Sequence, residues 1–275
     1  MLYDILMMFF AYAFLGWCVE ASYAALKTGQ FVNRGFLNGP ICPIYGFGVI
    51  LVLTCLHPLR GSGVALFLGS VLLTSLLELI TGFLLEKIFQ QRWWDYSEEP
   101  FNLGGYICLR FSIGWGLACL FVIKLIHPTV TFTLHAIPHP IGQGILCLFF
   151  IGIAIDIAAT IRAISKLNYR LNQIDEAAAK IRELSDELGE NIADKVIDAA
   201  ERGSDLKEVL ENQKEELRSA MTERKSRLQQ ILDMDQASDQ RRLLKAFPKM
   251  HSSRHPKALE HLRHRAEHNQ KKRKS

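Results

Sequence analysis

Five long apolar stretches occupy the first part of this 275-residue sequence, at about residues 3–26, 40–56, 64–86, 106–126 and 141–161. A helix needs about 20 apolar residues to cross the ~30 Å hydrocarbon core of a bilayer. Four stretches reach that length; the second, with about 17 residues, begins at Pro40 and contains Pro43 and Gly46. We therefore expect an all-α integral membrane helical bundle with about five transmembrane helices.

Charge is distributed very unevenly along the chain. Residues 1–163 hold only 8 of the 32 Lys and Arg residues and 8 of the 28 Asp and Glu residues. This excludes a wholly soluble globule, and six cysteines within the apolar part, without a CxxC pair, exclude a disulfide-rich secreted domain. We expect a transmembrane domain at 1–163, a cytoplasmic amphipathic helical or coiled-coil region at 164–247 and a basic, disordered tail at 248–275.

Basic residues in the short connections predict the orientation. One side has Lys27, Arg34, Lys87, Arg92 and, after the fifth stretch, Arg162, whereas the other has only Arg60 and Lys124. We expect the protein in the inner (plasma) membrane of the cell. Because cytoplasmic loops are enriched in Lys and Arg, we expect its N-terminus outside and its C-terminal region in the cytoplasm. The first stretch lacks a basic start and a small-residue cleavage site, so we expect a retained span.

Polar residues gather toward one predicted face of the bundle. Intramembrane ionisable groups are costly and usually face a partner or a wet cavity. The candidates for a polar vestibule on the cytoplasmic side, which would handle a small solute, are Glu20, Asn33, Arg34, Glu78, Glu86, Asp95 and Arg110, with Asp156 at the same depth. The acids would bind cationic or hydroxyl groups or carry protons, and the arginines would pair with acids or hold an anion.

Two alternatives remain open for these residues. The same groups could be ion pairs that lock helices together, for example Glu20 with Arg34 or Glu78 with Arg110. The aromatic residues Trp93, Trp94 and Tyr96 at the end of a span are typical of an interfacial belt, and contact with a ligand is the second interpretation.

Four segments together resemble a bacterial membrane protein family described as putative ABC-transporter type IV, or ABC transporter permease. They are GWCVE (Gly16 to Glu20), NRGFLNGPICPIYG (Asn33 to Gly46), ELITGFLLE (Glu78 to Glu86) and the run from Trp93 to Gly116. The resemblance covers about residues 1–160 and implies a multi-pass inner-membrane protein and a transport component. The sequence has no GxxxxGK[ST] phosphate loop, so a transporter built on it would need a separate ATPase subunit.

The C-terminal part carries apolar residues at helical spacing, among them Ile164, Leu167, Leu171 and Ile174. This pattern predicts an intrachain hairpin or a coiled coil that joins copies into a homo-oligomer. Residues 241–275 hold 12 basic and 2 acidic residues, which suits contact with anionic lipid, with nucleic acid as the other polyanion and solvated disorder as the alternative to both. Five histidines there lack an accompanying framework of cysteines and acids, so we expect no metal and no cofactor.

Two other functions compete with transport. A non-catalytic membrane anchor or scaffold would use the C-terminal coiled coil to bind partners. A membrane-embedded enzyme is the weaker alternative, because no catalytic triad or metal site is evident in the sequence.

Overall fold

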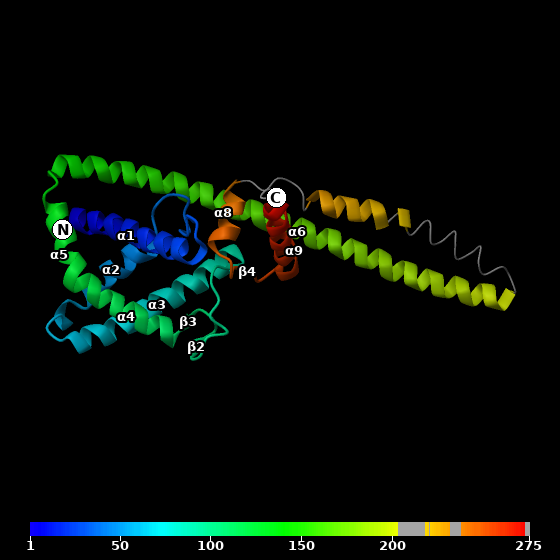
Figure 1. Cartoon of the computed structure of the whole chain (residues 1–275), viewed down its shortest axis with the longest axis horizontal. Coiled ribbons are helices and arrows are strands. Elements are labelled where there is room, and N and C mark those ends of the chain that lie inside the picture. The colour runs from blue at the N-terminus through cyan, green and yellow to red at the C-terminus, as the bar shows by residue number, and fades with distance from the viewer. Residues whose placement is uncertain (203–217, 220, 232–237, 273–275) are drawn as a thin grey trace. The chain divides into compact units, whose positions relative to one another are not determined.

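The computed structural model describes residues 1–202, 218–219, 221–231 and 238–272 (Figure 1). The chain divides into two compact units. Unit 1 combines Met1–Ser165 with Ser238–Arg254, and unit 2 combines Lys166–Ala237 with His255–Ser275. Unit 1 is therefore built from two segments that lie far apart in the sequence.

Unit 1 begins with three helices that follow the first three apolar stretches. They are α1 (Leu2–Thr28), α2 (Pro43–Cys55) and α3 (Gly63–Phe89), with the short 3₁₀ turn η1 (His57–Leu59) before α3. Proline suits the start of α2, because the first amide of a helix has no intrahelical partner. The 13 residues of α2 are too few to cross a bilayer, so this helix is shorter than the expected span.

The fourth apolar stretch forms one helical run that is longer than expected. It consists of α4 (Leu109–Phe121), the π-helical turn η2 (Val122–Ile126) and α5 (His127–His135). Pro128 cannot donate a hydrogen bond, and its ring crowds the carbonyl of Lys124 in a regular α-helix. The wider π turn lies at that point and lets the run continue.

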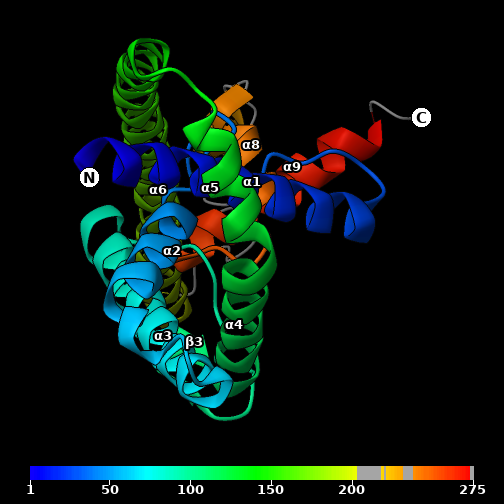
Figure 2. The same cartoon turned by 90° about the vertical axis from the view of Figure 1, so that its left-hand side faces the viewer.

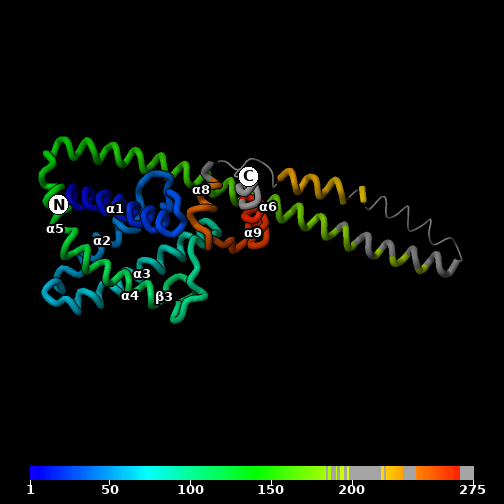
Figure 3. The backbone as a smooth tube through the Cα atoms, viewed as in Figure 1, coloured from blue at the N-terminus to red at the C-terminus, as the bar shows by residue number. Residues whose placement is uncertain are grey.

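The fifth stretch begins α6 (His139–Arg202), which continues through the change in composition near residue 163 as one 64-residue helix (Figure 3). Its apolar part belongs to unit 1 and its charged part to unit 2. The helix does not break there, because apolar residues at Ile164, Leu167 and Leu171 keep the helical spacing and all three are buried.

Four helical runs are long and apolar enough to span a membrane: Leu2–Thr28, Gly63–Phe89, Leu109–His135 and His139–Glu183. Only 11–28% of the residues in their most apolar windows are buried inside the structure, so most apolar side chains point outward. Large exposed apolar surfaces of this kind suit contact with lipid. The protein is thus a membrane protein with an all-α helical bundle, as predicted.

Helices α1 and α2 pack together, as do α3 and α4 (Figure 2). Small residues allow the close approach. A Cβ atom on Gly16 of α1 would clash with the Tyr45 ring of α2, and one on Gly116 of α4 would clash with Val71 of α3. Packing of this kind, rather than water exclusion, holds helices together in lipid.

The strands are only two residues long. β1 (Gln91–Arg92) pairs antiparallel with β4 (His251–Ser252), and β2 (Asn102–Leu103) pairs antiparallel with β3 (Ile107–Cys108). Helix α8 (Ser238–Ala246) precedes β4. The β1–β4 pair joins the end of α3 to a segment about 160 residues further along the chain.

Unit 2 contains the charged part of α6, the helix 221–231 and α9 (Pro256–Lys272). Arg170 donates to the carbonyl of Ile231 and Arg224 donates to the carbonyl of Lys180, each at 2.9 Å. Residue numbers rise on one helix as they fall on the other, so the two pair antiparallel within one chain. The basic segment expected to be disordered contains β4 and α9; residues 273–275 lie outside the described residues.

Candidate functional site

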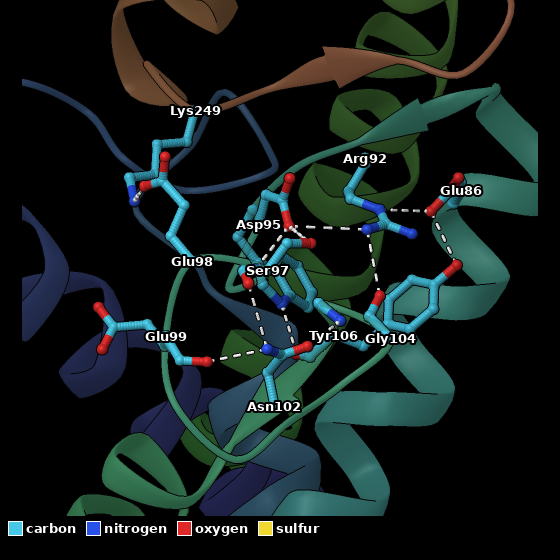
Figure 4. Close-up of polar contacts among 12 residues, drawn as sticks. Glu86, Arg92, Asp95, Ser97, Glu98, Glu99, Asn102, Gly104, Tyr106 and Lys249 are labelled. Carbon is cyan, nitrogen blue, oxygen red and sulfur yellow. Dashed lines mark hydrogen bonds and ion pairs between the residues drawn. The ribbon is translucent and has the colours of Figure 1, made fainter.

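Arg92 is the centre of a polar network where α3 ends (Figure 4). Its Nε donates to Oε2 of Glu86 at 2.8 Å, and its Nη1 donates to the Gly104 carbonyl at 3.1 Å. The guanidinium lies 4.5 Å from the ring centre of Tyr106, whose hydroxyl donates to the same Glu86 oxygen at 2.8 Å. Asp95 lies 3.6 Å from Arg92 Nη1. The planar guanidinium can serve all of these groups at once, which a lysine could not.

The turn that completes this network depends on Gly105. Its φ of +75° favours glycine, and a Cβ atom there would lie within 2.8 Å of side-chain atoms of Ser97, Asp95 and Arg92. The carbonyl of Gly105 accepts from the amide of Tyr96 at 2.9 Å. Asn102 closes the turn, because it donates to the carbonyl of Glu99 at 2.8 Å and accepts from the amide of Gly105.

The network shifts the acidity of its members. Burial by itself would raise the pKa of Asp95, but hydrogen bonds from the hydroxyl and amide of Ser97 and the charge of Arg92 outweigh it and lower the pKa. Burial, the hydrogen bond to Glu86 and the charge of Glu86 raise the pKa of Tyr106. Asp95 is therefore held ionised and Tyr106 is held as a neutral donor.

The same loop places Tyr96 against a buried acid. Burial, followed by the charge of Glu78 and the hydrogen bond to it, raises the pKa of Tyr96. The Tyr96 hydroxyl donates to Oε1 of Glu78 at 3.2 Å, and its ring stacks on Phe111 at 4.8 Å. Glu78 is only 8% exposed, and its Oε2 is buried with no hydrogen-bond partner among the described residues. The indole of Trp115 in α4 lies beside the same carboxylate.

Glu20 lies in a second polar group between α1 and α2. The Tyr45 hydroxyl donates to Oε1 of Glu20 at 2.6 Å, and Arg34 Nη1 lies 3.6 Å from Oε2. The Tyr45 ring packs edge-on against Trp115, with centres 5.5 Å apart. Tyr45 and Trp115 thus connect the surroundings of Glu20 with those of Glu78. The expected pair between Glu20 and Arg34 is present.

Asp156 fixes the loop before α2. Its Oδ1 accepts from the amide and the side chain of Asn38, both at 2.9 Å, and its Oδ2 accepts from the amide of Gly39 at 2.7 Å. Asn33 holds the other end of this loop, because its Oδ1 accepts from Trp17 Nε1 at 2.8 Å. Both side chains satisfy backbone or indole groups of their own bundle, so their contacts are structural.

We call residues 238–254 the C-terminal strap, because this segment contacts two separate connections of unit 1. Arg242 donates to the carbonyls of Gly35 and Phe36, at 2.8 and 3.2 Å. The Ser253 hydroxyl donates to Oε1 of Glu86 at 2.6 Å. The strap thereby links the 33–39 loop to the end of α3.

Aromatic residues form the apolar side of this contact. Trp93 is 3% exposed, and its ring packs against Phe36 on one side and against Phe247 of the strap, each at 5.0 Å. Trp94 donates to the carbonyl of Tyr106 at 2.9 Å. Trp93 therefore lies within the protein, where an interfacial belt would have placed it at the surface.

The expected pair between Glu78 and Arg110 is absent. The side chain of Arg110 is 75% exposed and lies 3.7 Å from Glu99. Five of the seven vestibule residues lie in three contact groups: Glu20 with Arg34, Glu86 with Asp95 through Arg92, and Glu78 with Tyr96. A sixth, Asn33, lies in the 33–39 loop.

Several residues of these contacts were missed as site residues. In the sequence, Arg92 supports only the predicted orientation, Tyr106 lies in the run from Trp93 to Gly116 without a predicted role, and Ser253 carries no signal. Tyr45 lies within the motif from Asn33 to Gly46, and this position in the motif is the sequence signal that could have identified it as the partner of Glu20.

A family described as "Putative ABC-transporter type IV" matches residues 7–161, which include most of α1, all of α2 to α5 and the apolar part of α6. All seven predicted vestibule residues and the whole Arg92 network except Ser253 fall within the matched range. No curated protein and no solved structure matches the chain.

Proposed function

Because this chain belongs to the family described as putative ABC-transporter type IV, we propose that it is the permease component of a transporter and handles a small solute. Its long apolar helices contact lipid. Together with the family match, they identify a membrane transporter-like protein. We further propose that it lies in the plasma membrane with its C-terminal region in the cytoplasm, which the basic residues of the connections support.

The energy for transport would come from a second protein. The sequence contains no GxxxxGK[ST] phosphate loop, which ATPases of this kind use to hold the nucleotide phosphates. We propose that a separate ATPase subunit supplies this step. Purified full chain should show no ATP hydrolysis by itself, and a cognate ATPase should gain solute-stimulated activity when it is added.

The solute site that we propose lies where Glu20, Tyr45, Glu78, Tyr96 and Trp115 come close together. The observation that carries it is Oε2 of Glu78, a buried carboxylate oxygen without a hydrogen-bond partner among the described residues. A polar atom of this kind is costly unless a ligand or a proton satisfies it. Carboxylates with neighbouring aromatic rings suit a small solute that carries an amine or hydroxyl groups.

Thermal unfolding of the full chain in lipid nanodiscs tests this site. We would screen small amines, sugars and amino acids for a rise in Tm and then repeat the effective probes on two variants. Glu78→Gln should abolish the rise, because Gln cannot attract a cation. The control is Glu98→Gln, since Glu98 has a 90% exposed side chain and only a 3.6 Å pair with Lys249. A rise that survives in Glu78→Gln would overturn the proposed site.

One observation favours the scaffold as a second function. Helix α6 runs without interruption from the apolar part into unit 2, where it pairs with the helix 221–231. Unit 2 could hold partners, join copies into a homo-oligomer or contact anionic lipid through its basic end. A chain that binds no probe but forms a stable oligomer, measured by light scattering, would favour this function.

A further inference from the structure

Glu78 differs from the neighbouring acids of unit 1 in how it is satisfied. Glu20, Glu86 and Glu99 each lie within 3.7 Å of an arginine, and Asp156 accepts hydrogen bonds from N–H groups. No described residue forms an ion pair with Glu78. The Tyr96 hydroxyl donates to its Oε1, and the Trp115 indole lies beside the carboxylate without closing a hydrogen bond on Oε2.

An ionised carboxylate in such a place is expensive. Helix α3 is one of the four long apolar runs, and Glu78 is buried inside it with Oε2 shielded from solvent. An intramembrane acid usually binds a cation or carries a proton. The two candidate ligands for Oε2 are therefore a cation and a proton.

The surroundings favour the smallest ligand. Metal ions need several ligands, and no group of three or more His, Cys, Asp or Glu residues that could hold one occurs in the described ranges. Close packing surrounds the carboxylate, because the Tyr45 ring is pressed against Gly16 of α1 and packs on Trp115, so a proton is the ligand that fits while no solute is bound. A proton needs no space and forms a covalent O–H bond at Oε2.

We infer that Glu78 is a proton-binding residue that takes up an exchangeable proton at Oε2, which rests on the proposed transport function and adds proton exchange at its solute site. Uptake from hydronium forms the O–H bond, leaves water and converts the carboxylate to a neutral acid. Release returns the proton to water and restores the negative charge. The loop that carries Tyr96 covers this carboxylate and is held in place by Arg92 and Asp95.

Tyr96 in the loop is the titratable group that contacts Glu78. The charges of Cys108 before α4 and of Glu20 in α1 act on Tyr96, and Glu20 itself is held by Arg34 and by Tyr45 of α2. The hydroxyl of Tyr96 donates to the carboxylate and so favours its ionised form. Removing that hydroxyl should make the proton harder to release.

Infrared spectroscopy of the full chain in nanodiscs tests the inference without a solute. Solvated carboxyl groups are ionised between about pH 6 and 9, so a protonated-carboxyl C=O band in that range reports a shielded acid. We expect such a band to disappear as the pH rises, to shift when glutamates carry a ¹³C carboxyl group, and to be absent from Glu78→Gln. Glu98→Gln should keep it, and Tyr96→Phe should move its titration midpoint to higher pH.

Several outcomes would overturn the inference. They are no band in the wild type at any pH in this range, a band that does not respond to ¹³C-glutamate, or a band that survives in Glu78→Gln. Isotope labelling needs no substitution, so the result stands even where Glu78→Gln folds poorly. The infrared band is independent of the Tm screen. A band without a solute-dependent rise in Tm supports the proton site and contradicts the solute site. A solute-dependent rise in Tm without a band contradicts the proton site alone.

Discussion

The hydroxyl of Tyr96 lies 3.2 Å from Oε1 of Glu78, although Tyr96 belongs to a connecting loop and Glu78 to the interior of α3. The loop reaches this position because Asp95 and Ser97, on either side of Tyr96, bond to each other at 2.6 Å, and Arg92 holds Asp95. The state of the loop and the state of the buried acid are therefore linked through a single hydroxyl group.

Replacing Gly105 with alanine should destabilise this loop. The substitution places a Cβ atom against Asp95, Ser97 and Arg92 in a backbone conformation with φ +75°. Strain of this kind costs about 1–3 kcal/mol, before any displacement of the network. The measurement is the Tm of the full chain in nanodiscs. Gly61→Ala is the matched control, because nothing lies within 4 Å of its Cβ position; equal melting of the two variants would contradict the role given to Gly105.

Acid should weaken the same loop through Asp95. Since its folded pKa lies below the ordinary value of 3.8, the ionised side chain stabilises the loop above that value, and the stabilisation is lost as the pH falls through the lower folded pKa. We expect the Tm difference between wild type and Asp95→Asn to be constant above about pH 5 and to shrink as the pH falls below it. If the Tm difference between wild type and Asp95→Asn grew on acidification, the lowered pKa given to Asp95 would be contradicted.

Asp156→Asn should loosen the loop that precedes α2. An asparagine keeps one acceptor oxygen and turns an NH₂ group toward the amides of Asn38 or Gly39, so at least one buried donor loses its partner. The cost is about 1–3 kcal/mol. Hydrogen exchange followed by mass spectrometry should show faster exchange at residues 33–42. The control is Asp186→Asn at an exposed position of α6, and unchanged exchange in Asp156→Asn would refute the structural role.

Phe247→Ala should release the C-terminal strap from Trp93. The half-buried ring packs edge-on against Trp93, and its loss should cost about 2 kcal/mol. We expect faster hydrogen exchange in residues 33–39 and 91–98 together, because the strap contacts both. Lys249→Ala removes only an exposed pair with Glu98 and should change little. Faster exchange in only one of the two loops would mean that the strap does not join them.

The long apolar runs could be predicted from the sequence because a span is a local property of length and hydropathy. The four runs in the structure overlap four of the five expected stretches, and the shortest expected span became α2, which ends before His57 and Pro58. The length of the fourth run could not be predicted from hydropathy, because the apolar stretch ends near residue 126 whereas the π turn lets the helix continue past Pro128 to His135.

The contacts of the candidate residues were harder to predict, because they depend on turns and on segments far apart in the sequence. Glu20 and Arg34 lie on adjacent elements, and their pair was foreseen. Arg110 is the second residue of α4 and projects toward Glu99 rather than into the bundle, so its pairing with Glu78 was wrong. The role of Arg92 depends on Gly105, whose positive φ no periodicity reveals.

The discontinuity of unit 1 has a consequence for how the protein is made. Synthesis delivers all the apolar helices and then the charged part of α6 before the strap exists, so Trp93 and Glu86 emerge without Phe247 and Ser253. Until residue 254 has left the ribosome, β1 has no pairing partner and the 33–39 loop lacks Arg242. The part of unit 1 around Trp93 therefore reaches its final form only after residue 254 has been synthesised, and a nascent chain stalled before that point would expose Trp93 to any factor that recognises unpaired aromatic surface.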